Sequence, residues 1–214
     1  MCGILGWIGF DSTDPPNNLD ESLSLLENRG PDGVGCWTES GIWLGHTRLS
    51  IIDHVGGKQP MLSSCGQAVI AFNGEIYNYE ELKRRYNYPY KTNSDTEVLL
   101  AGYLTQGIEF VQDLKGMFAF GLYDRRLRKL YLVRDPFGIK PLIYSSDKNS
   151  VLFSSELKSI LKVRGTVTAN RNGLIEFVLR RYIPAPQTAF EGIYRLNRGE
   201  IREIDCQNTN QKNW

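Results

Sequence analysis

The chemistry that this sequence suggests begins at its second residue, a cysteine directly after the initiator methionine. Once Met1 is removed, Cys2 carries a free α-amino group with a pKa of about 7.7–8.0, which can take the thiol proton directly or through water. Such a nucleophile needs no histidine, and Gly3 lets the backbone come close to a ligand. The alternative is that Cys2 is a small buried hydrophobe, the commonest role of a free cysteine.

The remaining cysteines and the histidines offer no competing chemistry. The other cysteines are Cys36, Cys65 and Cys206, with no CxxC pair, and the only histidines are His46 and His54. This spacing does not predict a metal site. We expect His46 to be a hydrogen-bonded strand residue, and the thiols to be reduced in a cytoplasmic protein because a chain of this size needs no disulfides.

Composition predicts one globular domain that acts on a small substrate. The 214 residues are 41% hydrophobic, enough for a full core, and the net charge is +1, which recruits neither nucleic acid nor an anionic membrane. The apolar opening, residues 1–10, has no basic leader and is too short for a membrane span, so it predicts a buried strand. The basic cluster of residues 125–129 has no interleaved aromatics and predicts a solvated hairpin turn.

The first half of the chain contains several helix and turn signals. Asn18 and Glu21 form a capping-box pattern before a helix that should end near Asn28, and the turn formers of residues 29–33 follow. Asn73-Gly74 lies between two apolar runs, which on local grounds predicts a type I′ hairpin turn. Two further capping boxes, at residues 78–81 and 94–97, predict helices, and the second places Asp95 in a first helical turn.

The second half of the chain predicts strands covered by helices. Residues 117–154 contain four apolar runs separated by short polar turns, the pattern of an antiparallel meander. Several runs are apolar on both faces, so they should lie inside a layered structure. Helices are expected at residues 155–163 and 172–182 and a last strand at residues 199–205, and the polar tail of residues 207–214 is similar to the start of a connector.

A family resemblance extends over almost the whole chain. The motifs that carry it are Cys2-Gly3-Ile4, Arg29-Gly30-Pro31-Asp32-Gly33, residues 45–53 (GHTRLSIID), residues 72–78 (FNGEIYN), Ser94-Asp95-Thr96-Glu97, residues 116–120 (GMFAF), residues 134–141 (RDPFGIKP) and Ser155-Glu156-Leu157-Lys158. In this order and spacing they resemble the class II glutamine amidotransferase domain of glutamine-hydrolysing asparagine synthetases. Phosphoribosylamine- and glucosamine-forming amidotransferases fit less well. The resemblance implies an α+β fold, a four-layer αββα sandwich of two antiparallel sheets with an N-terminal nucleophile.

The resemblance also assigns roles in catalysis. Cys2 matches the nucleophile that attacks the side-chain amide of glutamine, forms a thioester and releases ammonia. Asn73 and Gly74 match the oxyanion hole, where an amide side chain and a backbone N–H point at the oxygen that gains charge. A plain hairpin turn is the other interpretation of these two residues, and both can hold.

The substrate-binding residues follow in the same way. Arg48 matches the residue that holds the α-carboxylate of glutamine through two parallel hydrogen bonds, with a surface ion pair as the alternative. Asp95 and Glu75 match the acceptors of the α-ammonium, although an acid in the first turn of a helix is favourable by itself. Leu49, Ser50, Ile51 and Ile52 match the residues that line the glutamine pocket through their backbone, and alternate side chains among them should face the core.

The sequence departs from the full-length family in one respect. The glycine-rich Ser-Gly-Gly-x-Asp-Ser loop of the ATP-dependent synthetase domain does not occur, so ATP and Mg²⁺ are expected only in that absent domain, with no cofactor in this chain. We therefore expect a glutaminase domain at residues 1–206, the start of a connector at residues 207–214, and a fragment of a longer ligase of asparagine biosynthesis.

Three functions stay open at this stage. The leading one is an active glutaminase that supplies ammonia to a synthetase domain or subunit. The second is a binding module that keeps the fold but no longer turns over, and the third is an N-terminal cysteine acylase for another amide. Arg48 and Asp95 argue against the third, because together they suit the two charged ends of an amino acid. A homodimer is one assembly that the sequence leaves open.

Overall fold

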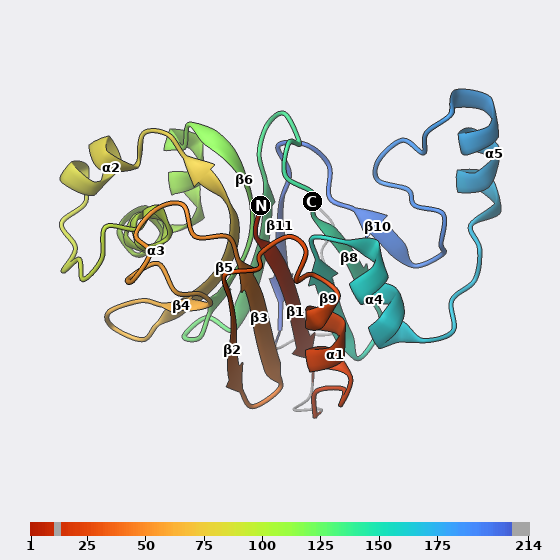
Figure 1. Ribbon diagram of the computed structural model, residues 1–214, viewed down its shortest axis with the longest axis horizontal. Helices are drawn as coiled ribbons and strands as arrows, with labels where there is room; N and C mark the ends of the chain where they lie inside the picture. Colours follow the sequence, from red (N-terminus) through yellow and green to blue (C-terminus); the bar gives the residue numbers. More distant parts are fainter. Residues whose placement is uncertain (11–13, 207–214) are drawn as a thin grey trace.

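Two antiparallel sheets pack face to face in the computed structural model, which describes residues 1–10 and 14–206 (Figure 1). The six-stranded sheet has the order β10-β8-β9-β1-β3-β2, and the five-stranded sheet has the order β11-β7-β6-β5-β4. The strands of the first sheet are β1 (Gly3–Gly9), β2 (Gly33–Glu39), β3 (Ile42–Arg48), β8 (Ile143–Ser146), β9 (Ser150–Ser154) and β10 (Ile193–Arg195). Those of the second are β4 (Met61–Leu62), β5 (Ala68–Ile76), β6 (Gly116–Asp124), β7 (Lys129–Arg134) and β11 (Ile201–Asp205).

Strands that are apolar on both faces explain this layering. Every residue of β1 is buried, and so are the first six residues of β5. One face of each strand meets the opposite sheet, where Ile4, Leu44 and Phe153 share a cluster with Val69 and other side chains of the second sheet. The other face of each strand needs a second apolar cover, which helices provide.

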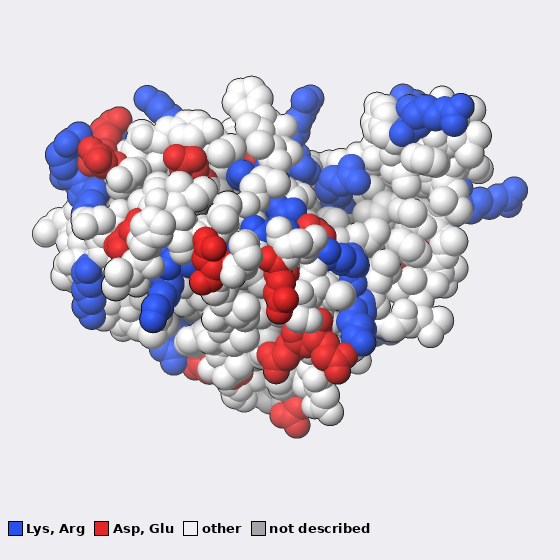
Figure 2. Space-filling model, in the orientation of Figure 1, with Lys and Arg blue, Asp and Glu red and all other residues white. Residues whose placement is uncertain are grey.

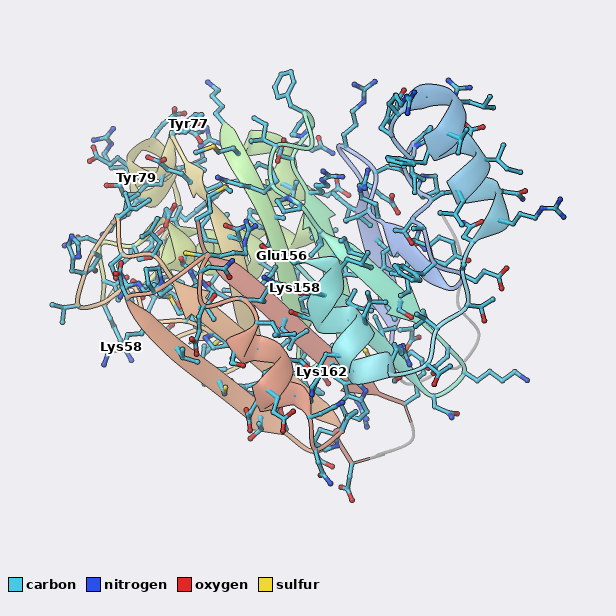
Figure 3. The ribbon with its side chains drawn as sticks, turned by 45° about the vertical axis from the view of Figure 1, so that its right-hand side comes forward. Lys58, Tyr77, Tyr79, Glu156, Lys158 and Lys162 are labelled. Atoms are coloured by element: carbon cyan, nitrogen blue, oxygen red, sulfur yellow. The ribbon has the colours of Figure 1, made fainter. Side chains whose placement is uncertain are left out.

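Helices cover the outer face of each sheet. On the five-stranded sheet lie α2 (Tyr79–Arg85), α3 (Asp95–Gln106) and the 3₁₀ helix η1 (Gly107–Asp113), and on the six-stranded sheet lie α1 (Leu19–Ser24) and α4 (Leu157–Arg164). Lys162 of α4 pairs with Glu21 of α1 at 2.8 Å (Figure 3). The resulting order of layers is α, β, β, α, as the resemblance implies. Helix α5 (Arg171–Arg180) stands apart from these layers in Figure 1.

Two of the sequence predictions about strands are wrong. Asn73 and Gly74 form no hairpin turn: they lie inside β5, where they pair with Ala119 and Phe118 of β6. Asn-Gly favours a turn locally, but nine continuous residues of β5 pair with β6, and this tertiary pairing overrides the local preference. Residues 117–154 also form two hairpins instead of one meander, because β6 and β7 belong to one sheet and β8 and β9 to the other.

Two of the three predicted capping boxes do not form, although their helices do. The amide of Asn18 donates to the carbonyl of Lys162, and the side chain of Asn78 bonds backbone groups of Asp113 and Lys115, so neither caps its helix. Ser94 does cap α3 by accepting from the amide of Thr96. Tertiary partners therefore replaced the local ones wherever another backbone segment came within reach.

The surface carries both signs of charge on the face seen in Figure 2. The basic residues after β6 occupy a hairpin turn, as predicted, and Arg125 pairs there with Glu39 at 2.7 Å. All four cysteines are free thiols. Within residues 1–10 and 14–206, no helix combines the length and apolarity needed to cross a membrane. The connector predicted at residues 207–214 lies outside the described residues.

Candidate active site

A pocket of about 140 Å³ is lined by residues from six separate parts of the chain. They are the residues just before β1, the end of β3 with the loop after it, the second half of β5, the start of α3, one residue of β6 and one residue of the loop after β7. Nine of the ten residues that the sequence analysis proposed for the site line it: Cys2, Arg48, Leu49, Ile51, Ile52, Asn73, Gly74, Glu75 and Asp95. Ser50 is the exception, and its backbone amide bonds the carboxylate of Asp32 at 2.7 Å.

The pairing of β1 with β3 places Cys2 beside the loop after Arg48. Gly3 pairs with Thr47, so the next residues, Cys2 and Arg48, come together at the strand ends. The amide of Leu49 lies 3.4 Å from Sγ of Cys2. A side chain at Gly3 would come within 2.5 Å of Oγ1 of Thr47, so a glycine is required for this close approach.

The thiol of Cys2 is partly shielded from water. Burial raises the pKa of Cys2, while the amide of Leu49, the terminal amine of Met1 and Arg48 act in the opposite direction. These neighbours stabilise a thiolate, and Asp95 opposes it. The sulfur therefore stands in a site where charge is costly unless positive groups and N–H donors compensate for it.

Arg29 holds the backbone of the cysteine from the other side. Its Nε donates to the carbonyl of Cys2 at 3.0 Å, and its Nη1 pairs with Glu156 at 3.0 Å. Its Nη2 lies 4.0 Å from the sulfur of Met1, which also lines the pocket. The sequence motif around Arg29 predicted a loop of defined shape, but not this contact.

Asn73 presents a buried donor without a partner. The residue is 1% exposed, and within the described residues its Nδ2 has no hydrogen-bond partner. A buried amide N–H left unpaired costs about 1–3 kcal/mol, so such a group is expected where a ligand supplies the missing acceptor. Asn73 and Gly74 line the same pocket as Cys2, and a donor there can bind an oxygen that gains negative charge.

Arg48 shapes the loop that follows it. Its guanidinium donates to the carbonyls of His54 at 2.9 Å, Asp53 at 2.6 Å and Ile52 at 3.3 Å. It makes no ion pair with the described part of the chain, so the surface ion pair considered from the sequence is wrong. The guanidinium instead closes residues 48–54 into a loop at the wall of the pocket.

The residues of this loop do not face the core. We expected alternate side chains of Leu49, Ser50, Ile51 and Ile52 to be buried there, and this is wrong: three are partly exposed and Ile51 is 62% exposed. The strand pattern ends at Arg48, so alternation between two faces also ends there. The next residues follow the pocket rim.

Asp95 is a buried carboxylate at the first residue of α3. Its Oδ2 accepts from the amide of Ile76 at 3.2 Å. Burial raises its pKa to about 6, and the nearby Glu75, which also lines the pocket, adds to the increase. No described side chain forms an ion pair with Asp95, so a ligand cation would relieve a charge that is otherwise costly to bury.

His46 is not part of this chemistry. Its Nε2 lies 3.1 Å from the carbonyl of Phe72, and burial lowers its pKa to about 4. The prediction of a hydrogen-bonded strand histidine is confirmed. Among the described residues, no group of three or more His, Cys, Asp or Glu side chains could hold a metal ion.

Several other residues of the pocket have no role predicted from the sequence. Met117 of β6 and Lys140, which follows β7, both line it, and Gln59 and Thr96 join each other there through a 3.3 Å hydrogen bond. Gln59 also accepts from the amide of Phe72 at 2.7 Å. Lys140 belongs to the motif of residues 134–141, which was the one available signal for it.

Known proteins with similar sequences share one type of domain. The sequence profile described as glutamine amidotransferase domain matches residues 1–214. Asparagine synthetase [glutamine-hydrolyzing] 1 of Bacillus subtilis is 35% identical over 93% of this chain, and asparagine synthetase B [glutamine-hydrolyzing] of Escherichia coli K12 is 40% identical over 78%. The chain spans 33% and 31% of the lengths of these two relatives.

Solved structures share the fold at lower sequence identity. The allosteric regulatory enzyme of purine biosynthesis aligns with a TM-score of 0.68 and 20% identity over 95% of this chain and 47% of its own. The glutamine phosphoribosylpyrophosphate amidotransferase of B. subtilis aligns with a TM-score of 0.63 and 18% identity, covering 96% of this chain and 49% of its own. These matches support the layered fold described above.

Proposed function

The chain belongs to the glutamine amidotransferase domain family, and from that premise we propose that it hydrolyses the side-chain amide of glutamine to glutamate and ammonia. The observation that carries the proposal is the unpaired Nδ2 of Asn73 in the same pocket as Cys2, within the described part of the chain. A nucleophile and a free hydrogen-bond donor in one pocket are what acyl transfer needs.

Cys2 supplies the nucleophile and, after removal of Met1, also the base. The α-amine takes the thiol proton, and Sγ adds to the amide carbon of glutamine to give a tetrahedral oxyanion. The C–N bond then breaks, the same proton passes to the leaving nitrogen, and ammonia departs from a thioester. Water adds to the thioester with the amine again as base, and glutamate leaves as the thiol reforms.

Asn73 and Gly74 stabilise the oxyanion. The side-chain Nδ2 of Asn73 and the backbone N–H of Gly74 donate to the oxygen that gains charge in both tetrahedral intermediates. Both residues lie within a long strand, which fixes their positions before the substrate arrives. Preorganised donors of this kind need no rearrangement as the charge develops.

Each charged end of glutamine binds protein side chains of the opposite charge. Arg48 receives the α-carboxylate, and Asp95 with Glu75 receives the α-ammonium. Leu49, Ile51 and Ile52 contact the substrate through the backbone of the loop that Arg48 holds. This arrangement selects an α-amino acid over a simple amide, which argues against the acylase alternative.

Ammonia from this site serves an ATP-dependent amidation domain. The chain spans about a third of the length of the asparagine synthetases named above, so the same acceptor chemistry is the natural proposal. In this proposal residues 1–206 are the glutaminase domain and residues 207–214 begin the connector. ATP and Mg²⁺ act in the synthetase domain, and glutamine hydrolysis itself needs no cofactor.

The test is an assay of the purified chain with glutamine, aspartate, ATP and Mg²⁺. Intact mass first establishes whether Met1 has been removed, because a peptide nitrogen is not a base and a chain that keeps Met1 should be nearly inactive. We expect glutamate without asparagine or AMP. Asparagine formed together with AMP would contradict the proposed division of labour. Binding of glutamine without any glutamate would favour the inactive binding module.

A further inference from the structure

Lys140 is a buried cation in the pocket with no assigned role. The residue is only 5% exposed, and it lines the pocket together with Cys2. Within the described residues its Nζ makes no hydrogen bond and no ion pair, in contrast to its backbone N–H and carbonyl, which are both bonded. Lysine is rarely buried without a partner, so its presence here calls for a function.

The backbone around Lys140 is held rigidly. Asp135 accepts hydrogen bonds from the amides of Phe118, Phe137, Ile139 and Lys140, with lengths of 3.0 to 3.3 Å. Arg134 donates from Nε to the carbonyl of Lys140 at 2.8 Å. The carboxylate of Asp135 is thus bonded to backbone amides, and it makes no hydrogen bond to the ammonium group within the described chain. The loop therefore fixes the backbone of Lys140, while the ammonium group has no bonded partner among the described residues.

Charges of both signs surround Lys140. Burial is the largest cause that lowers its pKa, and Arg29 lowers it further, while Cys2, Glu75 and Asp135 favour the charged form. Cys2 in turn lies near the terminal amine of Met1 and near Arg48, which favour a thiolate, and near Asp95, which opposes it. Lys140 and Arg29 therefore add positive charge around the start of the chain besides that of Arg48.

We propose that Lys140, together with Arg29, is a positioning residue that supplies fixed positive charge to Cys2. A cation there favours loss of the thiol proton, because it stabilises the thiolate. It also favours loss of the α-amine proton, because two like charges repel. Both effects act in one direction: they increase the fraction of Cys2 with an anionic sulfur or a neutral amine at neutral pH. Lys140 acts through Cys2 and does not react itself.

This inference rests on the proposed function only for its link to turnover. The effect of Lys140 on the acidity of Cys2 exists whether or not glutamine is hydrolysed. The thiol and amine titrate as a coupled pair, so the measurable quantity is the apparent pKa of the pair.

The test measures alkylation of Cys2 by iodoacetamide as a function of pH. Chain without Met1, verified by intact mass, is alkylated between about pH 5 and 10, a range that spans the ordinary pKa values of the thiol and the amine, and the modified N-terminal peptide is quantified by mass spectrometry. Lys140→Met and Lys140→Gln remove the charge, Lys140→Arg keeps it, and Lys58→Met is the matched control. Lys58→Met removes the same charge from an exposed position between two residues that line the pocket (Figure 3).

We expect the midpoint of the alkylation profile to rise by about one pH unit in Lys140→Met and Lys140→Gln. Lys140→Arg should restore it, and Lys58→Met should leave it unchanged, since solvent screens an exposed charge. Near-ultraviolet circular dichroism selects the variants that are folded. Superimposed profiles of the wild type and either neutral variant would overturn the inference. A midpoint that rises equally in Lys140→Arg would overturn it too, because packing and not charge would then be responsible.

Glutamine turnover separates this inference from the proposed function. The acid limb of the kcat/KM profile should move to higher pH in the same variants by a similar amount. A shifted alkylation profile in a chain without glutaminase activity would support the role of Lys140 and contradict the proposed function. Glutaminase activity of the chain, together with an alkylation profile that does not shift in the Lys140 variants, would support the proposed function and contradict the role of Lys140.

Discussion

The guanidinium of Arg29 donates a 3.0 Å hydrogen bond from Nε to the backbone carbonyl of Cys2. The other side of the guanidinium pairs with Glu156, directly before α4, and Glu156 also pairs with Lys158 (Figure 3). The residue after β9, Ser155, bonds both backbone groups of Ile4. The start of β1 is thus held on one side by a short segment from a distant part of the sequence.

Glu156→Gln tests this support of the nucleophile. A neutral glutamine side chain at this position cannot form the ion pair with Arg29, so the peptide group of Cys2 should be held less firmly. We expect kcat/KM for glutamine to fall by roughly 10-fold through misplacement alone, as steady-state kinetics would measure. Glu191→Gln, which changes an exposed glutamate, is the control. Identical kcat/KM for Glu156→Gln and the control would show that Arg29 holds Cys2 without Glu156.

Cys2→Ala should abolish glutamine hydrolysis without unfolding the protein. The substitution removes only the sulfur, whose described hydrogen-bond contacts are to the backbone of Leu49. Glutamate release should fall to the background rate, while the melting temperature changes little, and isothermal titration should still detect glutamine. Residual turnover above background would mean that another group attacks the amide.

Asn73→Ala should reduce kcat by on the order of 10²-fold, the usual effect of removing one donor from an oxyanion hole. KM should change much less, because the donor is engaged mainly when charge develops on the oxygen. The melting temperature should not fall, since Nδ2 has no partner among the described residues whose bond would be lost. A variant in which only KM rises would show that Asn73 binds the ground state of the substrate.

Asn73 also shows where the prediction from the sequence and the structure differ. Periodicity predicted layered strands with covering helices, because strands that are apolar on both faces admit few other arrangements. Local signals failed where distant segments competed. Asn73 and Gly74 favour a turn but pair with β6, and Asn78 favours a cap but bonds backbone groups of the last residue of η1 and of Lys115 beyond it. Local propensity does not contain the position of such partners.

The grouping of the proposed site residues in one pocket was predicted better than the local structure, for a different reason. A family resemblance assigns a complete set of site residues at once, and nine of the residues that it assigned line one pocket. It gave no role to Lys140, whose significance depends on burial and on the absence of a bonded partner in the described chain. It also gave no indication that Arg48 holds a loop, because the carbonyls that accept from its guanidinium come together only in the folded chain.

Arg48→Lys should raise KM for glutamine much more than it lowers kcat. An ammonium group cannot reproduce the planar fork that receives a carboxylate, and it cannot reach three carbonyls from one point. The loop of residues 48–54 should therefore also loosen, and limited proteolysis should cut it faster in the variant. Arg126→Lys in the exposed hairpin turn is the control. If KM for glutamine is unchanged while the loop is cut faster, Arg48 holds the loop but does not bind the substrate.

The raised pKa of Asp95 links the protonation of its carboxyl group to the stability of the folded chain. The carboxyl has a pKa of about 6 in the folded chain against an ordinary value of 3.8. The folded state therefore binds the proton more tightly than the unfolded state, and folding is penalised in full at pH values above about 6, where the carboxylate is buried and ionised. This penalty decreases as pH falls from about 6 and disappears below 3.8.

Asp95→Asn should consequently stabilise the free protein while it weakens glutamine binding. The amide keeps an oxygen that can accept from Ile76 and carries no charge, so the free energy of unfolding at about pH 7.5 should rise by up to about 3 kcal/mol, since each pKa unit corresponds to about 1.4 kcal/mol. The gain should shrink towards zero near about pH 4, below which both states bind the proton. Urea unfolding at both pH values measures it, with the exposed Asp14→Asn as control.

Glutamine binding should show the opposite dependence. The α-ammonium of the substrate needs the ionised carboxylate, so KM of the wild type should increase as pH falls through about 6, and Asp95→Asn should have a high KM that no longer varies in this range. Equal stability of the variant and the wild type at neutral pH would show that Asp95 is not strained in the free protein. A pH-independent KM in the wild type would show that Asp95 does not contact the α-ammonium of the substrate.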